Sequence, residues 1–101
     1  MSELKLTLED NQESKQYQVE IEGLFPRIEY IKTKDDKIYL THTEVPRSLE
    51  GRGIGSEIIR LALEDIKKQD LTLIPLCPFV ASYIKKHPEW RELVLKGINI
   101  A

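Results

Sequence analysis

The sequence predicts a single α+β domain in which a mixed, mostly antiparallel sheet of five to six strands is accompanied by two main helices. The segments before Pro46 alternate apolar and polar side chains, which is typical of strands with one buried face. From Ile54 onward, apolar residues recur mainly at helical spacing. A chain of 101 residues, of which 41% are hydrophobic and 32% charged, fits one small domain spanning residues 1–101.

The strands expected first form two pairs. Residues 4–8 and 17–21 alternate on either side of a polar turn at residues 9–15, and residues 28–32 and 37–43 flank a shorter polar segment. Because short polar connections join antiparallel neighbours, both pairs are predicted to be hairpins.

Two helices and a fifth strand are predicted in the second half of the chain. The apolar spacing from Ile54 to Ile66 predicts an amphipathic helix that covers the sheet. Residues 71–74 form a short apolar run, as expected for a strand buried between neighbours. A shorter helix is predicted to begin at Pro78, since proline is favoured at the first helical position, and to end before His87.

The tail leaves two structures open. Trp90, Leu93 and Val94 are spaced for a short helical cap, whereas residues 98–100 suit a last edge strand.

Composition argues against several classes of partner. A formal charge of -2 gives no electrostatic footprint for nucleic acid or an anionic membrane, and no apolar run approaches the roughly 20 residues that cross a bilayer. One cysteine and two distant histidines do not form a metal-ligand spacing. The single cysteine and an N-terminus without a secretory signal favour a cytoplasmic location, and the oligomeric state stays open.

The segment Glu50–Ser56, called the glycine loop below, places three glycines directly before the long predicted helix. Glycines allow several backbone N–H groups to face one hollow, and a helix N-terminus adds unpaired N–H groups and a positive dipole end. The loop therefore predicts a site for a phosphate-bearing ligand, with a purely structural turn as the alternative.

Two nucleotide motifs fail on this loop. A P-loop needs Lys followed by Ser or Thr after its second glycine, and no such pair follows Gly53. The dinucleotide fingerprint fits in spacing, since Ser56 takes the third small position and Asp70 follows about 20 residues after Gly51. It requires a βαβ context, however, and here four antiparallel strands come first.

The loop instead resembles the pyrophosphate loop of the GNAT superfamily of N-acetyltransferases, whose pattern is Gln or Arg, two residues, Gly, any residue, then Gly or Ala. Gly53 and Gly55 take the two small positions. Glu50 departs from the pattern, and Arg52 is a candidate to compensate for its negative charge. The chain is also similar to a compact, single-domain branch of that superfamily. The matching segments are residues 41–46, 51–56, 75–80, 83 and 86–89.

This resemblance implies a GNAT-like fold that binds acetyl-CoA and transfers the acetyl group to an amine carried by a protein or a small molecule. The acetyl group is expected near the opening between the fourth and fifth strands. The implied cofactor-binding residues are Val45, Glu50, Gly51, Arg52, Gly53, Ile54, Gly55 and Ser56. Two alternatives stay open: a non-catalytic acyl-CoA-binding module and a protein-interaction domain.

Three residues are candidates for catalysis. Cys77 is expected at the N-cap of the second helix, where the dipole favours a nucleophilic thiolate, although a small buried residue is the alternative. His42 and Glu44 lie on one side of a regular strand, where either side chain can accept the proton that an attacking amine releases. His42 is the preferred base because histidine titrates near neutral pH, and a hydrogen-bonded strand-end residue is its alternative.

Overall fold

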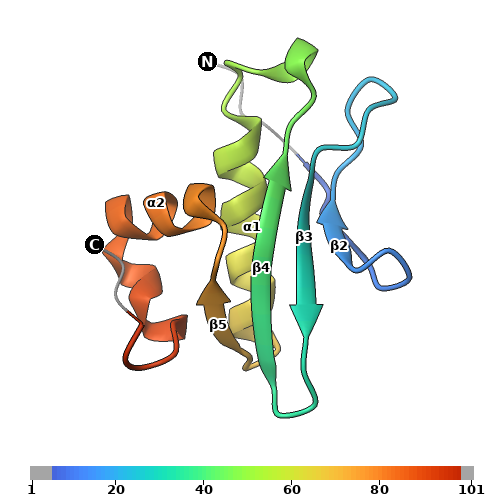
Figure 1. Ribbon diagram of the computed structural model, residues 1–101. Coiled ribbons are helices and arrows are strands. Elements are labelled where there is room, and N and C mark those ends of the chain that lie inside the picture. The colour runs from blue at the N-terminus through green and yellow to red at the C-terminus, as the bar shows by residue number, and fades with distance from the viewer. Residues whose placement is uncertain (1–5, 99–101) are drawn as a thin grey trace.

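A computed structural model describes residues 6–98 and confirms the α+β prediction (Figure 1). Its elements are β1 (Glu9–Asn11), β2 (Gln16–Gln18), β3 (Arg27–Lys32), β4 (Lys37–Glu44), the 3-10 helix η1 (Arg47–Leu49), α1 (Ile54–Lys68), β5 (Thr72–Pro75), α2 (Pro78–Lys86) and the 3-10 helix η2 (Pro88–Leu93). The strands follow chain order across one sheet, in which β4 and β5 pair in parallel and the other neighbours are antiparallel. Helix α1 lies behind the sheet and α2 lies beside β5 (Figure 1).

The first hairpin lies later in the chain than the alternation indicates. The prediction of a strand at residues 4–8 is wrong for residues 6–8, the part that the structure describes. Strand β1 instead lies in the segment that was expected to be a polar turn. Polar residues form this strand because it is the sheet edge and bonds to β2 through side chains as well as backbone, with Gln18 Nε2 3.0 Å from Glu9 Oε1. The second strand of the pair, expected at residues 17–21, is Gln16–Gln18.

The second hairpin is confirmed, with an irregularity that matters for the site. Glu29 pairs with His42 and Tyr30 pairs with Leu40, so Thr41 is an extra residue of β4 at a β-bulge. Strand β5 pairs with β4 only as far as Leu40, opposite Pro75. Beyond that point β4 continues without β5, which opens the sheet on one side.

The end of the chain differs in part from expectation. Strand β5 is buried, as expected, but it is the last strand of the sheet and not a strand between two others. On its outer side, the described residues form only an isolated parallel bridge between Leu73 and Val94. The helical cap around Trp90 is confirmed as η2. The edge strand considered at residues 98–100 falls largely outside the described residues.

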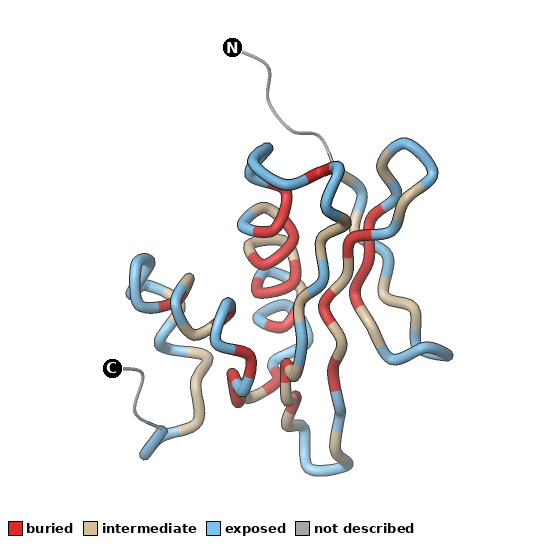
Figure 2. The backbone as a smooth tube through the Cα atoms, turned by 45° about the horizontal axis from the view of Figure 1, so that its top comes forward, coloured by how far each residue is buried: buried red, intermediate tan, exposed pale blue. Residues whose placement is uncertain are grey.

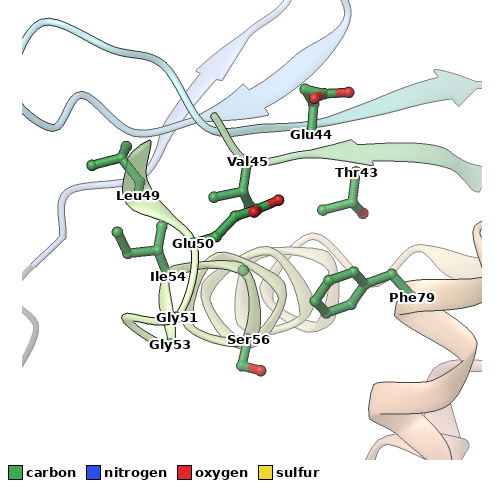
Figure 3. A pocket seen from close by; sticks show the side chains of 11 residues that line it. Thr43, Glu44, Val45, Leu49, Glu50, Gly51, Gly53, Ile54, Ser56 and Phe79 are labelled. Atoms are coloured by element: carbon green, nitrogen blue, oxygen red, sulfur yellow. The ribbon is translucent and has the colours of Figure 1, made fainter. Parts of the chain in front are cut away.

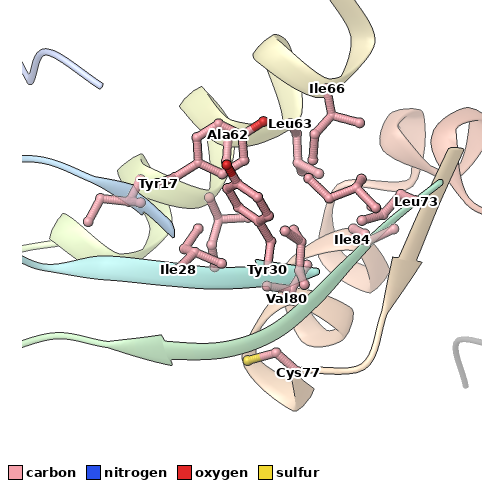
Figure 4. Close-up of a cluster of buried hydrophobic side chains, with 14 of the residues drawn as sticks. Tyr17, Ile28, Tyr30, Ala62, Leu63, Ile66, Leu73, Cys77, Val80 and Ile84 are labelled. Atoms are coloured by element: carbon pink, nitrogen blue, oxygen red, sulfur yellow. The ribbon is translucent and has the colours of Figure 1, made fainter. Parts of the chain in front are cut away.

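The core lies between α1 and the sheet. Figure 2 shows buried residues along α1 and the central strands, with exposed residues in the connecting loops. Figure 4 shows side chains from the sheet, α1 and α2 meeting in one cluster, with Cys77 at its edge. Ile58 and Ile66 of α1 are fully buried, and such burial contributes roughly 1.5–3 kcal/mol for each side chain.

Two buried tyrosines add polar contacts to this core. The Tyr17 hydroxyl donates a hydrogen bond to Asp65 Oδ2 on α1 at 2.8 Å, and the Tyr30 hydroxyl donates one to Asp10 Oδ1 at 2.5 Å. Burial, and then the neighbouring carboxylates, raise the pKa of both phenols well above the ordinary value. The contact with Asp65 fixes α1 to β2.

No helix within residues 6–98 combines the length and the apolar character that crossing a membrane requires.

Candidate active site

The glycine loop forms the predicted turn into α1. Gly51 and Gly53 have φ angles of 81° and 75°, in the left-handed region that glycine adopts without strain. Gly53 is the N-cap of α1 and supplies no side chain to cap it, and its carbonyl accepts the first helical bond from Glu57 N–H at 3.2 Å. The N–H groups of the first turn are thereby left for an external acceptor.

A cavity of about 330 Å³ lies against this turn (Figure 3). Its walls come from the end of β4, from η1 and the glycine loop, from the first turn of α1 and from the first turn of α2. The lining residues are Thr43, Glu44, Val45, Leu49, Glu50, Gly51, Gly53, Ile54, Gly55, Ser56 and Phe79. Seven of the eight predicted cofactor-binding residues are in this set. We call this space the glycine-loop cavity.

Arg52 is the predicted residue that does not line the cavity. Its Nη1 atom lies 3.0 Å from Glu22 Oε2, in an ion pair whose side chains are 45% and 63% exposed. Exposed pairs of this kind contribute about 0–1 kcal/mol, so Arg52 is held only weakly away from the cavity.

The positive potential that would attract an anion into the cavity comes from backbone N–H groups. Of its described lining residues, none is Lys, Arg or His, whereas Glu44 and Glu50 each bring a carboxylate. An anionic group would therefore be held by N–H groups and the α1 dipole, against the repulsion of two acids.

Sequence reasoning missed Thr43, Leu49 and Phe79 as lining residues. Phe79, which follows Pro78 at the start of α2, is 48% exposed and lines the cavity.

Cys77 is the N-cap of α2, as predicted, but it is only 4% exposed and is not among the residues that line the cavity. Its N–H donates to Leu40 O at 2.9 Å, which fixes it where β4 and β5 separate. Its Sγ atom lies 3.3 Å from Thr43 Oγ1, and Thr43 does line the cavity. One of the side chains that line the cavity, Thr43, therefore contacts the thiol.

His42 and Glu44 lie on the same side of β4, as predicted, and His42 Nε2 is 3.0 Å from Glu44 Oε1. Their side chains are 53% and 48% exposed. Glu44 lines the cavity and His42 does not. Of the three candidate catalytic residues, the structure therefore brings His42 and Glu44 into contact. Cys77 contacts Thr43, which lies between them in the sequence.

The chain is similar to known proteins over most of its length. A family model described as GCN5-related N-acetyl-transferase matches residues 16–93. Protein NATD1 of Xenopus tropicalis is 29% identical over 87 residues, covering 82% of this chain and 78% of its own length. Protein NATD1 of Danio rerio is 26% identical over 97 residues, covering 90% and 86%.

A solved structure shares the fold. The NMR solution structure of a GCN5-like protein from Staphylococcus aureus superposes with a TM-score of 0.67 at 22% identity, covering 98% of this chain and 94% of that one.

Proposed function

The chain belongs to the GCN5-related N-acetyltransferase family, and we propose that it binds acetyl-CoA in the glycine-loop cavity and transfers the acetyl group to an amine. One observation carries the proposal: a cavity that begins at an uncapped helix N-terminus ends at Thr43, whose hydroxyl contacts the single cysteine of the chain. The acceptor is an amine of a protein or a small molecule.

The residues present suit the phosphate end of this ligand. The N–H groups of the first turn of α1 offer donors to the pyrophosphate, and the left-handed angles at Gly51 and Gly53 bring the backbone close to it. Val45, Leu49 and Ile54 supply apolar walls for the rest of the ligand. Arg52 is available to approach the phosphates by leaving its exposed partner Glu22.

Acetyl-CoA supplies a thioester whose carbonyl carbon accepts a nucleophile. In the proposed route the Cys77 sulfur forms a bond to that carbon while the bond to the CoA sulfur breaks, and the released CoA thiol takes the proton that Cys77 loses. An amine then displaces Cys77, and its proton passes to His42 or Glu44, which contact each other on β4. Thr43, which lines the cavity and whose hydroxyl lies 3.3 Å from the Cys77 sulfur, positions that sulfur for the attack.

A second function, non-catalytic binding of acyl-CoA, is favoured by the burial of Cys77. In that case the loop holds CoA, and Cys77 and His42 are structural.

The experiment is isothermal titration of the protein with acetyl-CoA, with ATP and NAD as controls for general phosphate affinity. Saturable binding of acetyl-CoA alone supports the proposal, and no binding by the folded protein at millimolar ligand refutes it. Intact-mass measurement after mixing then looks for one acetyl group on the chain, with Cys77→Ala as the matched control. Binding by both forms without transfer by either supports the binding module. Transfer by Cys77→Ala supports direct attack of the amine on acetyl-CoA.

A further inference from the structure

Strand β4 has two different sides near its end. Thr43 lies on the inner side, where it lines the glycine-loop cavity and contacts Cys77. Figure 3 shows the Glu44 side chain directed to the opposite, outer side, as the alternation of a strand requires. His42 shares the outer side, because its Nε2 atom lies 3.0 Å from Glu44 Oε1. The candidate proton acceptors and the thiol are therefore on opposite sides of β4.

The inner side of β4 faces the helices, whereas the outer side is open. On the inner side α1 and α2 meet so closely that a Cβ atom added to Gly55 would lie 3.0 Å from Phe79 Cζ. Figure 1 shows α1 behind the sheet and α2 beside β5, and no helix of residues 6–98 lies over the other side of β2, β3 and β4. An acceptor therefore has access to Glu44 and His42 from the outer side.

The strand register continues this outer side into two rows of polar side chains that cross four strands. One row is Glu9, Gln18, Arg27 and Glu44, and the other is Asn11, Gln16, Glu29 and His42. We call these eight residues the outer ladder. Neighbours in it contact each other: Gln18 Nε2 donates to Glu9 Oε1 at 3.0 Å. Because adjacent strands lie about 4.8 Å apart, each row is about 14 Å long.

The outer ladder is acidic on balance. It holds the carboxylates of Glu9, Glu29 and Glu44 against one guanidinium, that of Arg27, which lies 2.9 Å from Glu29 Oε2. A small amine at Glu44 would meet only that residue and its neighbour His42. A chain molecule about 14 Å long would meet all three carboxylates, so charge and length together fit an extended, basic polypeptide segment.

We infer that the acceptor is a lysine in an extended, basic segment of another protein, which lies across the outer ladder with its lysine at Glu44. This inference rests on the proposed function for the acetyl transfer itself. As the lysine nitrogen takes the acetyl group, its ammonium loses two protons, one to the departing sulfur and one to Glu44 or His42. Residues two and four positions from the lysine lie on the same side of an extended segment, at about 7 and 14 Å. Basic side chains there would approach Glu29 and Glu9.

Two peptides of equal length and charge test this arrangement without acetyl-CoA. Both have nine residues, with a central lysine, four arginines and four serines. The first carries the arginines two and four positions from the lysine on both sides, and the second carries them one and three positions away. Fluorescence anisotropy of the labelled peptides at low salt is expected to show about threefold tighter binding of the first peptide. Equal affinities overturn the inference.

Glu29→Gln tests the surface, and Glu92→Gln is the matched control, because Glu92 is also an exposed carboxylate in an ion pair, with Lys67. Glu29→Gln is expected to weaken binding of the first peptide about threefold, and addition of Glu9→Gln to weaken it about tenfold in all. Arg27→Gln removes the only guanidinium of the outer ladder and is expected to tighten binding. Glu92→Gln is expected to change nothing, and equal effects of Glu29→Gln and Glu92→Gln overturn the inference.

Adding acetyl-CoA separates this inference from the proposed function. Faster acetylation of the lysine in the first peptide, measured by mass, supports both. Selective binding of the first peptide by a protein that does not bind acetyl-CoA keeps the outer ladder as a docking surface and refutes the proposed function. Binding of acetyl-CoA with equal affinity for the two peptides refutes the inference alone. Acetylation of spermidine in preference to both peptides also refutes it, because a small amine is then the acceptor.

Discussion

Replacing Tyr17 by Phe removes the hydroxyl that ties β2 to α1 and leaves the ring in place. Hydrogen bonds to charged groups contribute about 1.5–3 kcal/mol, and Asp65 keeps a contact from Gln69 Nε2, so we expect a loss near the lower end, about 1.5 kcal/mol. For a domain of this size such a loss lowers Tm by roughly 6–12 °C.

The loss should depend on pH. Because the pKa of Tyr17 is raised in the folded protein, mainly by burial, its contribution to stability is complete below the unfolded pKa of about 10 and declines as the pH rises through the folded pKa. Above about pH 10, the unchanged protein loses about 1.4 kcal/mol per pH unit from this residue, and Tyr17→Phe does not. The free energies of unfolding of the two proteins therefore converge by that amount per unit. Tyr30 is present in both proteins, and its contribution cancels.

Urea unfolding followed by Trp90 fluorescence measures both quantities, at about pH 8 and at half-unit steps to about pH 11.5. Tyr39→Phe is the control, because it removes a phenol from β4 and leaves the contact with Asp65 unchanged. A difference between Tyr17→Phe and the unchanged protein that stays constant across this range would contradict the linkage. A difference below about 0.5 kcal/mol at about pH 8 would contradict the assigned hydrogen-bond energy.

Three further outcomes concern the site. Gly53→Ala should cost about 1–2 kcal/mol in urea unfolding and weaken acetyl-CoA binding, since the φ of 75° disfavours a side chain; equal stability would contradict this. Glu50→Gln should tighten binding in titrations at low salt, with a gain that fades at high salt; a gain independent of salt would rule out a charge effect. Thr43→Val should slow acetylation of Cys77 and Thr43→Ser should restore it; equal rates would leave Thr43 no part in positioning the sulfur.

The parts of the fold that were predictable are those in which one residue type decides the conformation. Gly51 and Gly53 lie directly before the start of α1 at Ile54, and Pro78 is the first residue of α2. The strand β1 was missed because its residues bond through polar side chains at an open edge, where no buried face imposes alternation.

The site shows the same division. The glycine loop was predicted from local spacing to be a phosphate-binding turn before a helix, and in the structure it is such a turn and lines a cavity, while phosphate binding stays a prediction. The contact between Thr43 and Cys77 was not predictable, because it depends on the bulge at Thr41 and on where β5 leaves β4. The exposure of Phe79 depends in turn on how closely α2 approaches α1, which spacing along one helix does not reveal.

The close approach of Phe79 to Gly55 has an evolutionary consequence. A methyl group at position 55 and a full aromatic ring at position 79 compete for the same volume, because the added atom would lie 3.0 Å from the ring. Substitutions at the two positions should therefore be correlated in descent: lineages that acquire alanine at the first should carry a smaller side chain at the second. Alanine at position 55 arising beside a full ring at position 79 forces the ring to shift, whereas a smaller side chain at position 79 arising first removes that conflict.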